Sequence, residues 1–124
     1  RTELELPTEL DDVILRCLEK DPDSRIGTAD ELAGLLAELE RVIAQRYEDR
    51  PEGSYTTKLF DAGVKRIAQK VGEEGVETAL AAVAADSEEL VNESADLLYH
   101  LLVLLRAQGL KLSDITSTLE ARHG

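Results

Sequence analysis

The chain has 124 residues, with 26 Asp and Glu against 14 Lys and Arg, a formal net charge of −12 and a pI near 4.5. This balance excludes a surface that grips nucleic-acid phosphates directly, because such a surface must be basic. Hydrophobic residues make up 43% and charged residues 32%, as in a soluble globular protein. The length allows one domain, or one domain plus an appendage. Aromatic residues are only 3%, so aliphatic side chains must fill the core, which favours helices.

A single cysteine, Cys17, excludes an internal disulfide and a cysteine-based zinc cluster. The sequence has no basic stretch followed by an apolar run and a cleavage site, so we expect no signal peptide. Its most apolar run, residues 97–105, is too short to span a bilayer. We therefore expect a cytoplasmic protein with no membrane partner.

Apolar residues recur at helical spacing in the first two predicted elements. The first is a short amphipathic helix over residues 8–20. Thr28 and Glu31 form a capping box, which predicts a second helix over residues 28–47. The polar residues 48–54 include both Pro and Gly and predict a loop.

A short helical turn over residues 55–62 is predicted to end at Gly63, and a long helix to follow over residues 64–85. Gly72 and Gly75 lie inside that helix, although each costs about 1 kcal/mol relative to alanine. Two such glycines suggest that something approaches the backbone closely, with a mild kink as the alternative.

The next helix is predicted over residues 88–108, with Asp86 and Ser87 as capping residues and Gly109 at its end. Residues 97–105 are apolar on nearly all sides, which predicts a buried or subunit-interface helix.

A last helix is predicted from a cap at Ser113 to Arg122. No segment of useful length alternates with the period of a strand, and no internal repeat is present. The predicted fold class is all-α.

Two acidic clusters lie on consecutive predicted helices: Glu73, Glu74 and Glu77 on the first, Glu93 and Asp96 on the second. The pairs Glu74–Glu77 and Glu93–Asp96 are each spaced i, i+3, so each pair projects from one helix face. A short connection makes the helices antiparallel neighbours, which lets the pairs converge. Grouped carboxylates repel one another unless cations join them, and Mg²⁺ suits such a site.

The alternative is that these acids are simply solvated helix faces in an acidic chain. Against it, Glu93 and Asp96 directly precede the apolar run, and His100 continues their face at i+7 and i+4. The polar stripe is therefore predicted to enter the core, where acids need partners. A satisfied core histidine is the favoured interpretation of His100.

A concentrated basic group, Lys58, Lys65, Arg66 and Lys70, precedes the acidic cluster. Basic side chains beside a metal site are what a polyphosphate substrate requires. The alternative is ordinary ion pairing, for instance of Lys70 with Glu74 at i+4.

Three segments closely resemble the phosphoribosyl-ATP pyrophosphohydrolase family: SYTTKL at 54–59, KRIAQKVGEEGVETAL at 65–80 and ESADLLYHLLVLL at 93–105. The resemblance covers about residues 35–124. It implies a homodimeric helical bundle of the all-α nucleoside triphosphate pyrophosphatase type. It also implies Mg²⁺-dependent hydrolysis of phosphoribosyl-ATP to phosphoribosyl-AMP and pyrophosphate in histidine biosynthesis.

The resemblance also implies roles for single residues. Four acids are implied as metal ligands: Glu74, Glu77, Glu93 and Asp96. Glu73, which joins Glu74 and Glu77 in the catalytic set, is either a ligand or the group that orients the attacking water. Five residues are implied as substrate-binding: Ser54, Tyr55, Lys58, Arg66 and Lys70.

Residues 6–25 and 28–32 resemble instead the closing helices of a bacterial Ser/Thr kinase C-lobe. Kinase activity is excluded, because the Gly-rich loop, the catalytic Asp loop and the Asp-Phe-Gly motif are absent from the sequence. We therefore predict a kinase-like helical hairpin over residues 1–34, packed on a catalytic domain over residues 35–124. A recombined or engineered chimera and a natural protein with a coincidental hairpin both stay open.

Two other functions also stay open. One is a housekeeping nucleoside triphosphate pyrophosphatase of the same superfamily. The other is an inactive helical scaffold, in which the motif residues survive but the altered N-terminal part disturbs the dimer or blocks the site.

Overall fold

A computed structural model of the chain describes residues 29–123, and the regular structure within them is entirely helical. The helices are α2 (Ala29–Asp49), α3 (Tyr55–Ala62), α4 (Val64–Val83), α5 (Ser87–Ala107) and α6 (Leu112–His123). The predicted all-α class is confirmed. The helix predicted over residues 8–20, the capping residue Thr28 and the hairpin over residues 1–34 lie outside the described residues.

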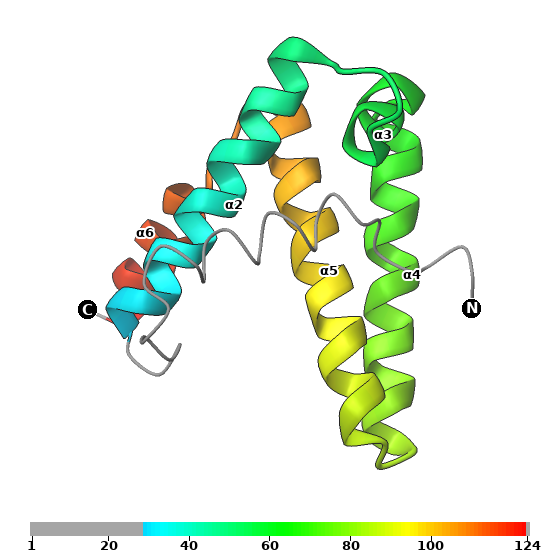
Figure 1. Cartoon of the computed structure of the whole chain (residues 1–124). Helices are drawn as coiled ribbons and strands as arrows, with labels where there is room; N and C mark the ends of the chain where they lie inside the picture. The colour runs from blue at the N-terminus through cyan, green and yellow to red at the C-terminus, as the bar shows by residue number, and fades with distance from the viewer. Residues whose placement is uncertain (1–28, 124) are drawn as a thin grey trace.

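Helices α4 and α5 form a long antiparallel hairpin (Figure 1). Helix α2 crosses the half of α5 that is remote from the hairpin tip, and α3 closes the same end of the bundle beside α4. The tip of the hairpin therefore extends beyond the cover of α2. Helix α6 is tied to α2 at its start, where the Leu112 N–H donates to the Glu40 carboxylate over 2.6 Å.

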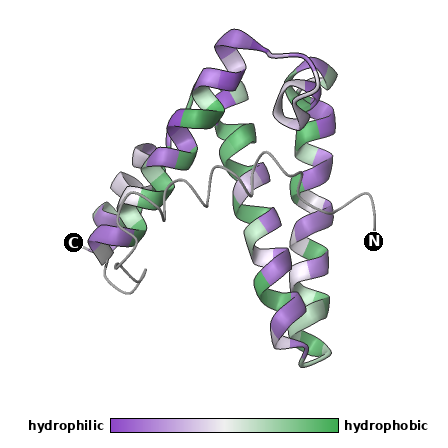
Figure 2. Cartoon of the chain, viewed as in Figure 1, coloured by the Kyte–Doolittle hydropathy of each residue, from purple (hydrophilic) through white to green (hydrophobic). Residues whose placement is uncertain are grey.

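The hydrophobic core lies where α2, α3, α4 and α5 meet, and it is mainly aliphatic, as the composition predicts. Figure 2 shows hydrophobic positions recurring along α5, including its second half. Burial of that half confirms the prediction for the apolar run at residues 97–105. The buried core residues are Leu39, Val42, Ile43, Leu59, Phe60, Ile67, Tyr99, Leu102, Val103 and Leu105.

Three of the predicted helix signals act as expected. The Asp86 carboxylate accepts a hydrogen bond from the Glu89 N–H and caps α5. Gly63, at φ 98°, joins α3 to α4 with a backbone geometry that favours glycine. Gly109, at φ 73°, follows α5, and the Leu110 N–H donates a hydrogen bond to the Leu105 carbonyl.

Several helix boundaries differ from the prediction by one or two residues, and two of them are at the end of α4 and the start of α6. Helix α4 ends at Val83 rather than Ala85, because Ala85 takes φ 58° and the Asp86 N–H bonds back to the Ala81 carbonyl. Helix α6 begins at Leu112, so Ser113 lies inside the helix and is not its cap.

Within residues 29–123, no helix combines the length and the apolarity that crossing a membrane would require.

Candidate active site

Helix α4 presents one buried face to α5. Ile67, Lys70, Glu74 and Ala81 are spaced three, four and seven residues apart, so they share this face, and all four are buried. Two ionisable side chains, Lys70 and Glu74, therefore lie in the packed layer between α4 and α5.

Helix α5 also carries a stripe of buried polar side chains. Glu93, Asp96 and His100, spaced three and four residues apart, are 3%, 3% and 1% exposed. The prediction that this stripe enters the core is confirmed.

The two helices bring three predicted ligands together. One carboxylate oxygen from each of Glu74, Glu77 and Glu93 lies within 4.8 Å of the others. Such an all-carboxylate donor set suits a hard divalent cation. Asp96 is buried nearby, and its charge acts on Glu74. Glu73 lies outside the trio, is partly exposed and accepts a hydrogen bond from Gln69 over 3.0 Å.

The electrostatics of the site also favour a cation. Burial raises the pKa of Glu74 above its usual range, and the charge of Asp96 raises it further. A hydrogen bond with Glu93 and the charge of Lys70 oppose this increase in the pKa. A bound cation would favour the ionised form of these carboxyl groups.

The predicted phosphate-binding residues fall into two environments. Lys58 and Arg66 are exposed. The Lys70 side chain is only 2% exposed, and its ammonium lies 3.5 Å from Glu74 Oε1 and 3.7 Å from Glu73 Oε1. The pairing of Lys70 with Glu74, the alternative raised by the i+4 spacing, is confirmed.

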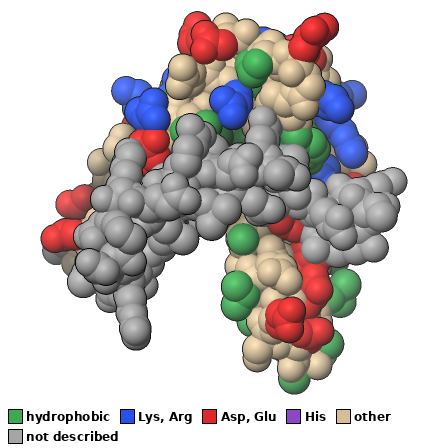
Figure 3. All heavy atoms as spheres, in the orientation of Figure 1, with side chains coloured by type: hydrophobic (Ala, Val, Ile, Leu, Met, Phe, Trp, Pro, Cys, Tyr) green, Lys and Arg blue, Asp and Glu red, His purple; other side chains and the backbone are tan. Residues whose placement is uncertain are grey.

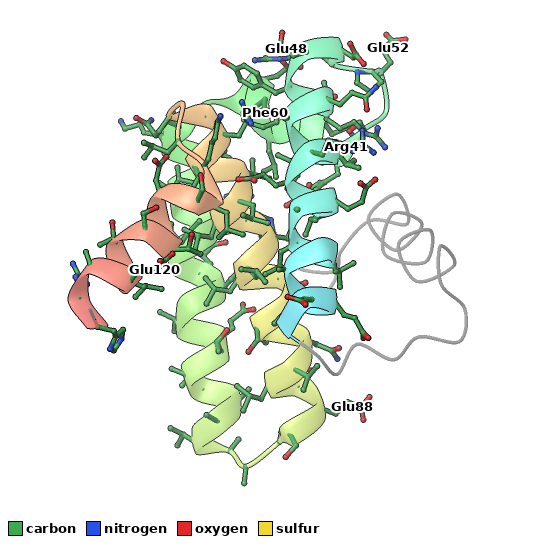
Figure 4. The ribbon with its side chains drawn as sticks, turned by 90° about the vertical axis from the view of Figure 1, so that its left-hand side faces the viewer. Arg41, Glu48, Glu52, Phe60, Glu88 and Glu120 are labelled. Carbon is green, nitrogen blue, oxygen red and sulfur yellow. The ribbon has the colours of Figure 1, made fainter. Side chains whose placement is uncertain are left out.

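Ser54 and Tyr55 lie where α3 begins. The Ser54 hydroxyl is buried and caps α3 by accepting from the Thr57 N–H over 3.2 Å. Beside it, the loop between α2 and α3 lines an open cavity of about 330 Å³. Figure 4 shows Glu48 and Glu52 at this end of the bundle. The cavity is lined by Arg46, Pro51, Glu52, Gly53 and Ser54.

His100 connects α3 to α5. Its Nδ1 lies 2.7 Å from the Asp96 carbonyl oxygen, so Nδ1–H donates there and Nε2 accepts from the Tyr55 hydroxyl over 2.9 Å. Burial, reinforced by neighbouring carboxylates, raises the pKa of Tyr55 to about 12, so its hydroxyl keeps its proton at neutral pH. A second hydroxyl contact, between Thr56 and Tyr99, joins the same two helices.

Residues 36–123 match the family model of phosphoribosyl-ATP pyrophosphohydrolase. The chain belongs to the phosphoribosyl-ATP pyrophosphohydrolase family. The matched region contains α4 and α5, which carry the converging carboxylates, together with α3 and α6.

Curated relatives of this phosphoribosyl-ATP pyrophosphohydrolase family member are named histidine biosynthesis bifunctional protein HisIE. The protein of Xanthomonas axonopodis pv. citri is 64% identical over 88 residues, which are 71% of this chain and 43% of the relative. That of Shewanella oneidensis is 63% identical over 97 residues, 78% of this chain and 44% of the relative. That of Escherichia coli K12 is 59% identical over 88 residues, 71% of this chain and 43% of the relative. The chain thus spans less than half the length of these relatives.

Some contacts of this family member's site escape prediction from sequence. The i+4 spacing of Asp96 and His100 indicates that they are neighbours, but the hydrogen bond from Tyr55 joins residues 45 positions apart. Arg46 and Gly53, which line the cavity, bear no sequence signal of that role beyond the loop composition around Gly53.

His100 makes the stability of the metal-free protein depend on pH. Burial lowers the pKa of His100 from 6.5 to about 4, so the folded state favours the neutral ring. Its contribution is fully present above pH 6.5 and is lost as the pH falls towards 4. As the pH falls from 7 to 4.5, we expect this effect of His100 to lower the free energy of unfolding by about 2 kcal/mol.

Urea unfolding with a chelator present, of the wild type and of His100→Gln, measures this loss. Glu74 opposes it, because a carboxyl group with a raised pKa loses its stabilising contribution as the pH rises through that pKa. Subtracting the unfolding free energy of His100→Gln from that of the wild type at each pH cancels the contribution of Glu74, which both proteins share. Parallel pH profiles would contradict the assignment to His100.

Proposed function

We propose that the chain hydrolyses phosphoribosyl-ATP to phosphoribosyl-AMP and pyrophosphate in histidine biosynthesis, using Mg²⁺. The observation that supports this most is the convergence of Glu74, Glu77 and Glu93 within 4.8 Å, in a chain whose residues 36–123 match the family model. The proposal concerns this chain alone and not the remaining length of the bifunctional relatives.

The donor set fits the proposed cation. Mg²⁺ binds through a few carboxylates and completes its shell with water and substrate phosphates. We assign the ligands to Glu74, Glu77, Glu93 and Asp96. When bound, Mg²⁺ would neutralise charge on the phosphoanhydride and its leaving group.

The remaining acid of the motif has a different environment. The Glu73 side chain is 40% exposed and lies outside the trio of Glu74, Glu77 and Glu93, so it can reach solvent from the rim of the site. We assign it to orienting the attacking water, with a ligand role as the alternative. Its Oε2 accepts the Gln69 hydrogen bond, and its Oε1, which lies 3.7 Å from the Lys70 ammonium, would accept a hydrogen bond from that water.

The substrate is proposed to bind across α3 and the start of α4. Lys58 and Arg66 are exposed and would hold the phosphates. Lys70 would add positive charge from its buried position on α4. Ser54 and Tyr55 would shape the pocket from the first turn of α3, next to the open cavity.

A second copy of the chain is proposed to cover the outer face of α4. Val76, Leu80 and Val83 are 60%, 62% and 85% exposed, and Gly72 lies on the same face. Figure 3 shows hydrophobic side chains at the surface of the hairpin end. Apart from its chain neighbours and the nearby backbone of α4, a Cβ built at Gly72 would meet no atom within 4 Å, so a second helix could approach there. This is the homodimer that the resemblance implies.

The division into a hairpin over residues 1–34 and a domain over residues 35–124 stays a proposal. It is supported by the start of the family match at residue 36, inside α2. The kinase-like residues precede this start, so the family match does not include them. The chimera hypothesis concerns these N-terminal residues.

Substrate selectivity tests the proposed reaction against the rival pyrophosphatase. We expect kcat/KM for pyrophosphate release from phosphoribosyl-ATP to exceed that from ATP or deoxynucleoside triphosphates by at least about 100-fold, or about 2.7 kcal/mol. Equal rates on all these substrates would favour a housekeeping pyrophosphatase. A folded chain that hydrolyses none of them would favour the inactive scaffold.

A further inference from the structure

Lys70 is enclosed to a degree that is unusual for a lysine. Its side chain is 2% exposed, whereas lysines are almost never fully buried unless they are paired. It lies on the α4 face that packs against α5, three residues after Ile67, which is 0% exposed. The ammonium group is therefore a fixed part of the interior and not a mobile surface charge.

The groups around this ammonium are mostly acidic. From α4, Glu74 Oε1 lies at 3.5 Å and Glu73 Oε1 at 3.7 Å. On α5, which packs against this face of α4, the buried acids and histidine are Glu93, Asp96 and His100. The charge of Lys70 lowers the pKa of both Glu74 and His100, so it acts on both helices.

We propose that Lys70 is a positioning residue, a built-in counter-ion of the acidic cluster, which holds Glu74 in place and competes with the divalent cation. This inference rests on the metal site of the proposed function. It assigns Lys70 a role other than direct contact with substrate phosphates.

Burial explains why the phosphate contact falls to other residues. To reach a bound phosphate, the ammonium would have to leave Glu74, a carboxylate with 0% exposure, without its cationic partner. Breaking a buried pair in this way is costly, because it strands a charge in the interior. Lys58 and Arg66 are exposed and can meet phosphates without this cost.

The proposal gives opposite signs for two measurable quantities. In the absence of metal, Lys70 offsets carboxylate repulsion, so its removal should destabilise the fold. In the presence of Mg²⁺, the fixed positive charge repels the cation, so its removal should tighten metal binding. A phosphate-contact role predicts neither effect in the absence of substrate.

The test compares Lys70→Met with Lys65→Met, a matched control that removes the same charge from an exposed position of α4. Isothermal titration calorimetry with Mg²⁺ alone gives the dissociation constant, and urea unfolding with a chelator gives the metal-free midpoint. For Lys70→Met we expect a dissociation constant about tenfold lower than that of the wild type, together with a lower urea midpoint. Lys65→Met should match the wild type in both.

Unchanged or weaker Mg²⁺ binding by Lys70→Met would overturn the proposal. If the variant does not fold in the chelator, the proposal requires that Mg²⁺ restore its helical circular dichroism, and a chain that stays unfolded at saturating Mg²⁺ would overturn it. Neither readout uses substrate. A wild type that binds Mg²⁺ and turns over substrate would thus keep the proposed function even if this inference failed, whereas a wild type without Mg²⁺ binding would remove the metal site on which both rest.

Discussion

Replacing Glu77 by glutamine is expected to lower kcat for pyrophosphate release by about 10³-fold while leaving the helical content unchanged. Glu77 is partly buried, and one of its oxygens lies within 4.8 Å of oxygens of Glu74 and Glu93. The amide keeps the volume of the side chain but removes the charge that would bind the cation. The stabilisation by a catalytic metal is worth several kcal/mol, and each 1.36 kcal/mol corresponds to a tenfold change in rate.

Glu120→Gln provides the control for this variant. Glu120 is exposed on α6, and Figure 1 shows this helix beside α2, away from the long part of the α4–α5 hairpin. Both variants lose one negative charge, so a general effect of net charge would appear in both. A Glu77→Gln protein that keeps most of its turnover at saturating substrate and Mg²⁺ would refute the ligand role.

Replacing Leu80 by glutamate is expected to convert the proposed dimer into a monomer. Leu80 is 62% exposed in the single chain, so the change should cost that chain little stability. In the dimer, the same carboxylate would be placed against Val76 and Val83 of an apolar interface, where an unpaired charge is strongly unfavourable. We expect the dissociation constant to rise at least about 100-fold, measurable by sedimentation at several concentrations.

Ala82→Glu introduces the same charge on the same helix as the control. Positions two apart on a helix point about 200° apart, so Ala82 lies away from the Leu80 face, and it is exposed. The control protein should keep the wild-type mass. Equal masses for wild type and Leu80→Glu would contradict the placement of the dimer interface on this face.

The sequence predicts the helices and the convergence of three acidic side chains well, because both depend on local periodicity. Glu74 and Glu77 share a face by their spacing alone, and the short turn near Asp86 makes α4 and α5 antiparallel. The helix ends are less predictable. Ala85 adopts the left-handed conformation that is more typical of glycine, so no local signal marks the end of α4.

Tertiary packing decides what the sequence leaves open. Lys58, Arg66 and Lys70 are alike as a basic group in the sequence, yet only Lys70 is enclosed, since it shares the α4 face that packs on α5. The spacing of Lys70 and Glu74 indicates that they can pair, but it does not show whether water surrounds the pair. The contact of Tyr55 with His100 likewise depends on how α3 is placed on α5.

The two glycines inside α4 show the same limit. Apart from the chain neighbours and the nearby backbone of α4 itself, no atom of the described residues comes within 4 Å of a Cβ built at Gly72 or Gly75. The described part of this chain therefore does not make the predicted close approach. A second copy or a bound ligand could make it, and a mild kink stays the alternative.

Pyrophosphate release from phosphoribosyl-ATP, measured over a Mg²⁺ titration that begins in excess chelator, tests the central claim most directly. The claim is that the buried carboxylates between α4 and α5 form a metal-dependent pyrophosphohydrolase site. The account predicts no turnover above background in the chelator and saturable activation as Mg²⁺ is added. Undiminished turnover in the chelator, or no turnover by the folded chain at saturating Mg²⁺, would contradict it.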